Sequence, residues 1–464
     1  MANQPTGSRV LEGKRLWEYA GGIMGLYLPV NFLNAYILVY FVYVVGLDAF
    51  LVSIGTALGV IVNAFCAPLF GYLADKKKPG RFGKRRSFMV FGLPGMVLSV
   101  ILTWLSWRTN YFGEQNFGIA AFLFIFQIAF FFNYAMIRSA YASSLPEQSQ
   151  DEKNRVKVST IQGMFSIIAT IIGIVLPLVL QSIANQPEMI YETPSDVAML
   201  KLLLPILGIA FGVVAVVFTL FAFVSIDESF AEHETESGTP SMSKTSFKDA
   251  LASIVWPISD KEYRKWLAAS TSMNVGMRMV VKVLAPLCTY VLLLKGSSFI
   301  VYILLVLPFA FIGFYIWSKR AKTNGLKDTY CKSTLIAFAF MACTTIFVIF
   351  QLVNWLTLVI AFVIIAGALF NIVTGYLLPN PIISALVDDA PDKVKEKLGG
   401  VVSGSYFGSY LFLLNIASAV GDIIIGILLS GVNARNPFFI ALVFPLAGLT
   451  YLISVLIFRS SKLR

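Results

Sequence analysis

The chain has 464 residues, of which 57% are hydrophobic and only 13% are charged. A soluble globular domain carries about 25% charged residues, so this composition excludes that class and predicts a polytopic membrane protein. The net charge of +11 does not indicate a nucleic-acid partner, because the Lys and Arg residues stand in short connections between apolar runs.

Few residues could support catalysis or metal binding. The four cysteines are scattered without CxxC spacing, and the single histidine, His233, lies in an acidic polar segment. We therefore expect no disulfide framework, no metal site, no cofactor and no enzyme active centre. The first fourteen residues are mostly polar, so no cleavable signal peptide is expected.

Twelve apolar stretches are long enough to cross a bilayer, which takes about twenty residues. They run approximately from 17 to 45, 49 to 74, 87 to 107, 118 to 144, 158 to 183, 201 to 225, 265 to 293, 298 to 318, 332 to 352, 355 to 386, 399 to 430 and 437 to 458. The pattern predicts an all-α polytopic membrane protein with twelve transmembrane helices in two six-helix bundles.

Basic residues gather in alternate loops. One set of loops holds Lys76, Lys77, Lys78, Arg81, Lys84, Arg85, Arg86, Lys153, Arg155, Lys319, Arg320, Lys322, Lys393, Lys395 and Lys397. The other set and its edges hold few, mainly Arg108, Lys201, Lys295 and Arg435. Because basic residues in short loops stay on the cytoplasmic side, we expect both termini in the cytoplasm and the protein in the plasma membrane.

One long polar connection, residues 227–261, follows the sixth apolar stretch. It divides the chain into an N-terminal bundle (1–225), a cytoplasmic linker (226–264) and a C-terminal bundle (265–464). The acidic part of the linker is interpreted as a tether. Its later part, SFKDALASIVWPI, could form an amphipathic helix at the membrane interface.

The two halves carry a faint repeat between their second and third spans. Gly71-Tyr-Leu-Ala-Asp-Lys-Lys is echoed by Gly313-Phe-Tyr-Ile-Trp-Ser-Lys-Arg. Two related six-helix bundles around a midplane site are the architecture that a secondary transporter needs in order to expose one cavity alternately to each side.

The stretch GYLADKKKPGRFGKRR resembles the loop pattern G-x-x-x-D-(R/K)…(R/K)-(R/K) of the major facilitator superfamily, through Gly71, Asp75, Lys76, Arg85 and Arg86. The longer stretch APLFGYLADKKKPGRFGKRRSFMVFG is similar to the glycoside-pentoside-hexuronide:cation symporters of the melibiose-permease kind, and RFGKRRSF to the related sucrose transporters. The resemblance implies that this loop makes cytoplasmic charge contacts that hold the outward-open state.

The chain also differs from the family that it resembles. The two cation-site acids of melibiose permease in span two fall on Asn63 and Ala67, and its span-one aspartate falls on Tyr27. Its span-four aspartate falls on Arg138, and its span-eleven lysine on Asn415. Sodium coupling of the melibiose type is therefore not expected. Arg138 fits the sucrose-transporter pattern better, although the proton-site aspartate of that family appears here as Gln127.

Polar stripes at helical spacing mark three spans. Span seven carries Thr271, Asn274, Arg278 and Lys282; span four carries Gln127, Phe131, Tyr134 and Arg138; span eleven carries Asn415, Ser418 and Asp422. Ionisable residues inside a span usually face a protein or water-filled interior. Three cations against one acid predict a positive cavity, which favours a substrate with a carboxylate, sulfonate or phosphate. Alternatively, Asp422 forms a structural ion pair with Arg278 or Lys282, and Arg138 reaches the lipid headgroups.

Other polar positions belong to spans one, two, ten and eleven. On span one, Tyr27, Asn31 and Asn34 share the side expected to line the cavity, opposite Glu18, Gly22, Gly25 and Pro29. Amides such as Asn63, Asn371 and Asn415 can bind sugar hydroxyls, although each is more often a contact between helices. Asn371 precedes Gly375 and two prolines, which predicts a bend in span ten.

The favoured hypothesis is a transporter that carries a sugar, glycoside or sugar acid by rocking one half against the other, as a monomer among membrane lipids. If a proton is co-transported, Asp422 is the first candidate carrier and Glu18 the second. The alternatives are a facilitative uniporter, a lipid or lysolipid transporter of the same fold, and a receptor that transports nothing.

Overall fold

The computed structural model describes residues 10–77, 80–105, 114–184, 194–228, 252, 254–294, 296–349, 355–397 and 402–462. Within these residues the regular structure is helical, apart from one isolated bridge between Leu47 and Glu114. The expected all-α fold is confirmed.

The helices follow the predicted spans closely. The first half contains α1 (Gly13–Leu38), which continues as the π-helix η1 (Val39–Val44), then α2 (Ala49–Lys76), α3 (Arg86–Thr103), α4 (Phe117–Gln148), α5 (Glu152–Ala184) and α6 (Pro194–Ser225). The second half contains η2 (Trp256–Ser259), α9 (Lys261–Pro286), the π-helix η3 (Leu287–Val291), α10 (Gly296–Asn324), α11 (Leu326–Cys343), α12 (Thr345–Ile349), α13 (Trp355–Ile372), α14 (Thr374–Leu377), α15 (Pro379–Asp388), α16 (Asp392–Lys397), α17 (Val402–Leu428), η4 (Gly431–Arg435) and α18 (Pro437–Arg459).

Eleven helices in the described part of the chain are long and apolar enough to cross a membrane. The twelfth expected span is α9, which falls short because amides and cations interrupt its apolar sequence. The bend predicted in span ten is confirmed, since α13 ends at Ile372 and two short helices follow it before Asp388. Residues 229–251 and 253, which make up most of the predicted linker, lie outside the described residues, so the division into bundles stays a prediction.

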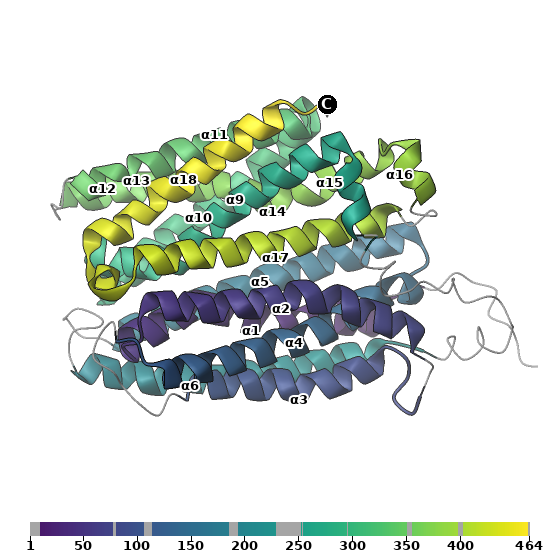
Figure 1. Ribbon diagram of the computed structural model, residues 1–464, viewed down its shortest axis with the longest axis horizontal. Coiled ribbons are helices and arrows are strands. Elements are labelled where there is room, and N and C mark those ends of the chain that lie inside the picture. The colour runs from purple at the N-terminus through teal and green to yellow at the C-terminus, as the bar shows by residue number, and fades with distance from the viewer. Residues whose placement is uncertain are drawn as a thin grey trace, which may run out of the picture.

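Helices α1 to α6 lie together on one side of the molecule, and α9 to α18 on the other (Figure 1). Helix α2 packs along α17 across the boundary between the halves, and α5 packs against α10. The start of α1 and the end of α18 lie at one end of the bundle, which we call the termini end. The turns that follow η1 and α17 lie at the opposite end, which we call the far end (Figure 1).

The described chain ends are tied to neighbouring helices at the termini end. The Leu11 backbone N–H donates to Asn154 of α5 (2.9 Å), and Ser461 donates to the Glu262 carboxylate of α9 (2.8 Å). Burial raises the pKa of Glu262, but hydrogen bonds from Lys265, the Lys462 backbone and Ser461 outweigh it and lower the pKa to about 2. This contact therefore adds stability at neutral pH that is lost as the pH falls from about 4.5 toward 2.

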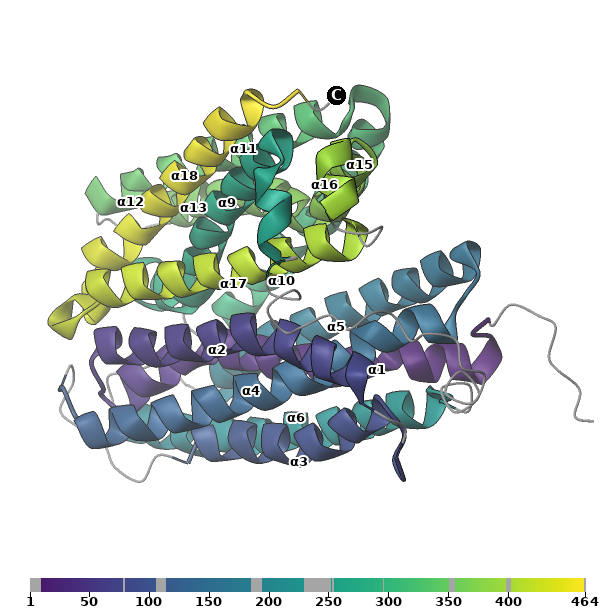
Figure 2. The ribbon, with the colours of Figure 1, turned by 45° about the vertical axis from the view of Figure 1, so that its right-hand side comes forward.

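The two halves touch at the far end. The Tyr43 hydroxyl donates to the Ala434 carbonyl (2.6 Å), and the rings of Tyr43 and Tyr290 stack at 5.4 Å. The Asp48 carboxylate accepts from Ser430 Oγ (3.0 Å) and from the Gly431 N–H (2.7 Å). Toward the termini end the halves diverge (Figure 2). This conformation is therefore closed at the far end.

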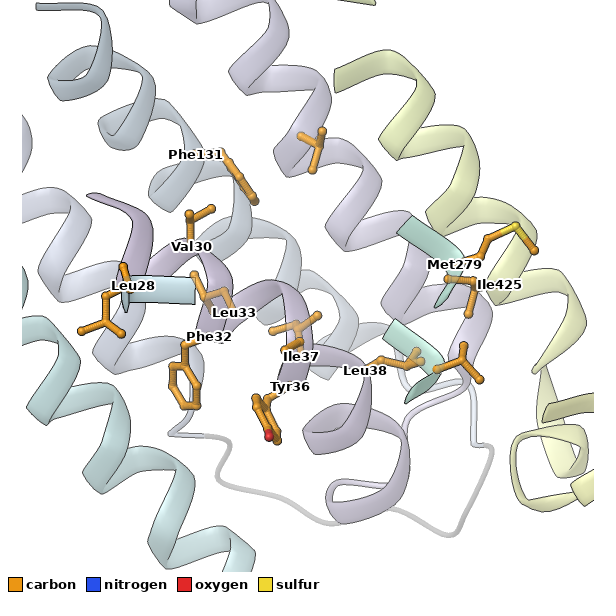
Figure 3. Close-up of a cluster of buried hydrophobic side chains, with 14 of the residues drawn as sticks. Leu28, Val30, Phe32, Leu33, Tyr36, Ile37, Leu38, Phe131, Met279 and Ile425 are labelled. Carbon is orange, nitrogen blue, oxygen red and sulfur yellow. The ribbon is translucent and has the colours of Figure 1, made fainter. Parts of the chain in front are cut away.

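The buried apolar core runs across both halves as one cluster. Figure 3 shows Leu38 at the end of α1, between Ile37 of the same helix and the pair formed by Met279 of α9 and Ile425 of α17. Contacts between helices of the two halves thus exclude water at the far end.

The ends of α1 and α9 share a backbone pattern that the sequence did not reveal. The N–H groups of Val45 and Leu47 bond five and six residues back, to Tyr40 and Phe41, and those of Leu292 and Leu294 bond in the same way to Leu287 and Cys288. The residue between each pair has a positive φ, at 86° for Gly46 and 48° for Leu293. Both halves therefore end their first helix in the same π-type cap.

Candidate functional site

Three charged side chains meet between α9 and α17. Arg278 holds both carboxylate oxygens of Asp422, at 2.8 and 3.1 Å, and Lys282 Nζ lies 2.9 Å from Asp422 Oδ1. Asp422 and Lys282 are buried, and Arg278 is only 11% exposed. The alternative of a buried ion pair is thus what the structure shows, with both cations on one carboxylate, and we call these three residues the triad. Its net charge is +1.

Close packing of α9 on α17 builds the triad. A Cβ atom at Gly421 would lie 2.9 Å from the Val275 carbonyl and 3.1 Å from Arg278 Cβ, so only glycine allows the helices to approach this closely. One turn away, Asn274 donates to the Leu414 carbonyl (2.9 Å) and to Ser418 Oγ (2.8 Å). Asn274 and Ser418 therefore join two helices here.

Lys282 also connects the two halves. Its ammonium donates to Thr56 Oγ1 of α2 at 2.9 Å, and both residues are buried. Nearby, a Cβ at Gly426 of α17 would lie 2.5 Å from Ser53 Cβ of α2, which shows how closely these helices pack. Lys282 thus belongs to the closed contact at the far end.

Arg138 of α4 has a different environment. Its guanidinium carbon lies 5.8 Å from the ring centres of both Tyr27 and Tyr134, and no ion pair forms to it from the described part of the chain. Tyr376 of α14, from the other half, lies near Tyr27, and its side chain is 64% exposed. These four residues bring one cation together with three aromatic rings, and we call them the Arg138 cluster.

The predicted amides have unequal roles. Asn31 donates to Thr170 of α5 (2.9 Å), which makes it a contact between helices in this conformation, while Asn34 is half-buried. Asn63 donates to Asn415 Oδ1 across the halves (3.2 Å), and the side-chain Oδ1 of Asn63 is buried without a hydrogen-bond partner among the described residues. That oxygen keeps its capacity to accept a hydrogen bond.

The second proton candidate, Glu18, lies near the termini end of α1. Its carboxylate is 3.4 Å from the ammonium of Lys14, which is highly exposed. A surface pair of this kind contributes little to stability, and the structure does not bring Glu18 to the triad or the Arg138 cluster.

The basic loop between α2 and α3 contacts its own half. The backbone N–H groups of Lys84, Arg85 and Arg86 all donate to the Glu228 carboxylate, those of Arg85 and Arg86 at 2.9 and 2.7 Å. Gly83 has a φ of +82°, and a Cβ there would collide with Glu228. Successive N–H groups at a helix start form a preferred anion site.

Side chains of the same loop make further contacts. Arg85 pairs with Glu147 of α4 at 2.8 Å, and the Arg86 guanidinium lies 3.9 Å from the Phe223 ring centre. Gly71 has open space around it, and the side chains of Asp75 and Lys76 lie outside the described residues.

Sequence reasoning missed several partners of the predicted residues. Thr56 gave no signal because a single threonine in an apolar helix is common. Asp48 and Ser430 stand in different loops, and nothing in either loop indicates the other. Tyr376 was overlooked among the aromatic residues, although its position after the predicted bend at Asn371 could have drawn attention to it.

A sequence profile of the family described as MFS/sugar transport protein matches residues 19–458. A curated relative, an uncharacterized symporter of Synechocystis sp., is 26% identical over 175 residues. That match covers 37% of this chain and 31% of the relative, so it spans less than a third of that protein.

Solved structures share the fold at low sequence identity. A nucleoside transporter, NupG, has a TM-score of 0.63 at 11% identity, and the match covers 98% of this chain and all of the NupG chain. The xylose transporter XylE of E. coli, in a partially occluded inward-open conformation, has a TM-score of 0.58 at 13% identity and covers 95% of both chains. A peptide transporter, POT, in complex with sulfate has a TM-score of 0.61 at 14% identity, over 98% of this chain and 96% of its own.

Proposed function

The chain belongs to the MFS/sugar transport protein family, and within that family we propose that it carries a sugar, glycoside or sugar acid, with an anionic substrate favoured. The coarser assignment follows from family membership and fold: this is a secondary transporter of the major facilitator type, with many membrane-spanning helices. The substrate class and the roles of individual residues are the proposal.

One observation supports an anionic substrate above all others. Within the described residues, both cations of the triad pair with the carboxylate of Asp422, whereas Arg138 has aromatic rings beside it and no carboxylate. A carboxylate or phosphate on the substrate would form charge-assisted, bidentate hydrogen bonds with this guanidinium. The rings of Tyr27 and Tyr134 would then pack against the body of the sugar, and Asn63 would accept from its hydroxyls.

The closed far end supports transport by alternating access. The hydrogen bonds of Asp48 and Lys282 across the boundary would break when the halves rock, and the termini end would close in their place. We propose that the termini end faces the cytoplasm and that the protein lies in the plasma membrane, because the basic loops gather at that end. The conformation described above is then the inward-facing one.

The triad constrains the way in which a proton could be coupled. A proton on Asp422 competes with Arg278 and Lys282 for the same two oxygens, so protonation requires that at least one cation withdraw. Because Lys282 also bonds to Thr56, its withdrawal would accompany opening of the far end. Uptake that runs equally well without any ion gradient would exclude this coupling and leave a uniporter.

The test is uptake into proteoliposomes of D-glucuronate and of its neutral counterpart D-glucose. We expect saturable uptake of the acid, reduced at least about tenfold in kcat/KM by Arg138→Gln, since a charge-assisted hydrogen bond is worth about 1.5 kcal/mol or more. Arg138→Lys keeps the charge but loses the bidentate geometry, so we expect an intermediate rate.

Arg320→Gln, at the termini end of α10, serves as the matched control and should leave uptake unchanged. Preference for the neutral sugar, with full activity in Arg138→Gln, would overturn the anion proposal.

A further inference from the structure

A groove with a volume of about 470 Å³ lies between α9 and α17, apart from the Arg138 cluster. Helix α9 contributes Leu267, Ala268, Thr271 and Val275, and α17 contributes Leu413, Ile416, Ala417 and Val420. The lining is apolar except for two hydroxyl groups and Arg264, which stands at the termini end of the groove.

The groove opens on the outer face of the molecule. On α17, Phe412 and Asn415 face α2, where they contact Phe65 and Asn63. Residues are spaced by 100° around a helix, so the mean direction of the four lining residues of α17 is turned by about 120° from that of Phe412 and Asn415, away from α2. In Figure 1, α9 is seen between α17 and α18, the two helices that flank this face.

The surroundings of the groove are apolar. Val420 is 44% exposed, and on the neighbouring α18 Leu449, Ile453 and Leu456 are exposed as well. In a membrane protein such a surface contacts the acyl chains of lipids.

The length of the groove fits one leaflet of a bilayer. From Arg264 to Val275 is eleven residues, or about 16 Å at 1.5 Å per residue. The hydrocarbon core of a bilayer is about 30 Å thick, so the groove spans about half of it and Arg264 stands at the polar boundary. Arg264 is exposed and forms no ion pair with the described residues.

We propose that this groove binds an anionic phospholipid, with an acyl chain along α9 and α17 and the phosphate on the Arg264 guanidinium. The positive charge selects for a net negative headgroup, because a zwitterionic headgroup carries its own cation. Arg264 can hold the phosphate with two parallel hydrogen bonds. The lipid would contact both α9 and α17, the helices that carry the triad, on their outer surface and away from the triad.

The experiment is a titration of the purified protein in detergent with phosphatidylglycerol or phosphatidylcholine of identical acyl chains, followed by native mass spectrometry. We expect phosphatidylglycerol to bind at least about fivefold more tightly, and Arg264→Gln to abolish that preference. Ala268→Phe fills the groove from an exposed position and should weaken the binding of both lipids.

Lys393→Gln removes an exposed cation from α16 at the same end and is the matched control, with no expected change. Equal binding of the two lipids, or a preference that survives both Arg264→Gln and Ala268→Phe, would overturn the proposal. Because the measurement involves no transport, its result is independent of the proposed function.

Discussion

The two halves of this transporter bury positive charge in opposite ways. In the second half, Arg278 and Lys282 share the carboxylate of Asp422 within a closely packed pair of helices. In the first half, Arg138 lies over Tyr27 and Tyr134, and none of the described carboxylates pairs with it. The triad in the second half needs no ligand, whereas Arg138 in the first half can still bind an anion.

This difference separates structural charge from charge that is available for binding. A buried ion pair can be neutral or even costly relative to an apolar core, but the removal of one partner is expensive because it leaves an uncompensated charge. A guanidinium has five N–H donors, so Arg138 can bind another partner in addition to the hydroxyls of Tyr27 and Tyr134. In the first of the two interpretations of the sequence, all three cations contribute to the positive charge of the cavity.

The largest expected effect comes from removing the carboxylate of the triad. Asp422→Asn leaves two buried cations without a counter-charge, so we expect a loss of about 3–5 kcal/mol in stability. The measurement is the thermal unfolding midpoint in detergent. Arg138→Met leaves no carboxylate behind, so its cost should be limited to the two ring contacts, about 1–2 kcal/mol.

A second substitution checks the cause of that loss. Lys282→Met in the Asp422→Asn background removes one unpaired cation, so we expect part of the stability to return. Two results would contradict the contrast between the halves. One is a double variant whose loss of stability equals the sum of the losses of the two single variants. The other is a larger loss of stability in Arg138→Met than in Asp422→Asn.

A smaller effect is expected at the contact that Lys282 makes with the first half. Thr56→Val removes the hydroxyl that accepts from Lys282 but keeps the shape of the side chain. The bond exists only while the far end is closed, so its loss should shift the equilibrium toward the other conformation by about 1 kcal/mol, or roughly fivefold. Hydrogen exchange at the Gly431 amide, which bonds to Asp48, should become faster.

Thr103→Val is the matched control for this measurement. Thr103 is also fully buried, but its hydroxyl bonds within α3, to the Ser99 carbonyl. Exchange at the far end should not respond to it. Equal responses to the two variants would mean that Thr56 has no specific part in the closed contact.

The helices were predictable because apolar length determines them, and the bend at span ten because Gly and Pro mark it. Even the polar stripe on α9 could be read from its spacing. The pairing of Asp422 with Arg278 or Lys282 was one of two alternatives, and the sequence could not select it, because the partner that a polar stripe faces depends on tertiary packing. Gly421 permits the approach of the helices, yet a glycine in an apolar helix has no assigned partner in the sequence.

The contacts of the basic loop show the same limit. Its residues matched a family pattern, but the pattern names no partner. Glu228 follows α6 in a segment that is acidic throughout, so nothing distinguishes it as the group that three N–H donors bind. The π-type caps were invisible for a different reason, since Gly46 marks one of them while Leu293 gives no turn signal.

The smallest predicted effect compares those two caps. Leu293 occupies the left-handed region at φ 48°, where a leucine costs roughly 1–2 kcal/mol and an asparagine less. Leu293→Asn should therefore raise stability by about 0.5 kcal/mol, after the loss of some apolar contact from this half-buried side chain. Gly46→Ala should lower it by about 1 kcal/mol, because alanine is strained at φ 86°. Opposite shifts of the unfolding midpoint would show that both halves use the same backbone conformation at this cap. They would also show that only the first half has the preferred residue, a glycine, at the position with a positive φ. Destabilisation by both changes would mean that packing around Leu293, rather than its backbone, decides the residue.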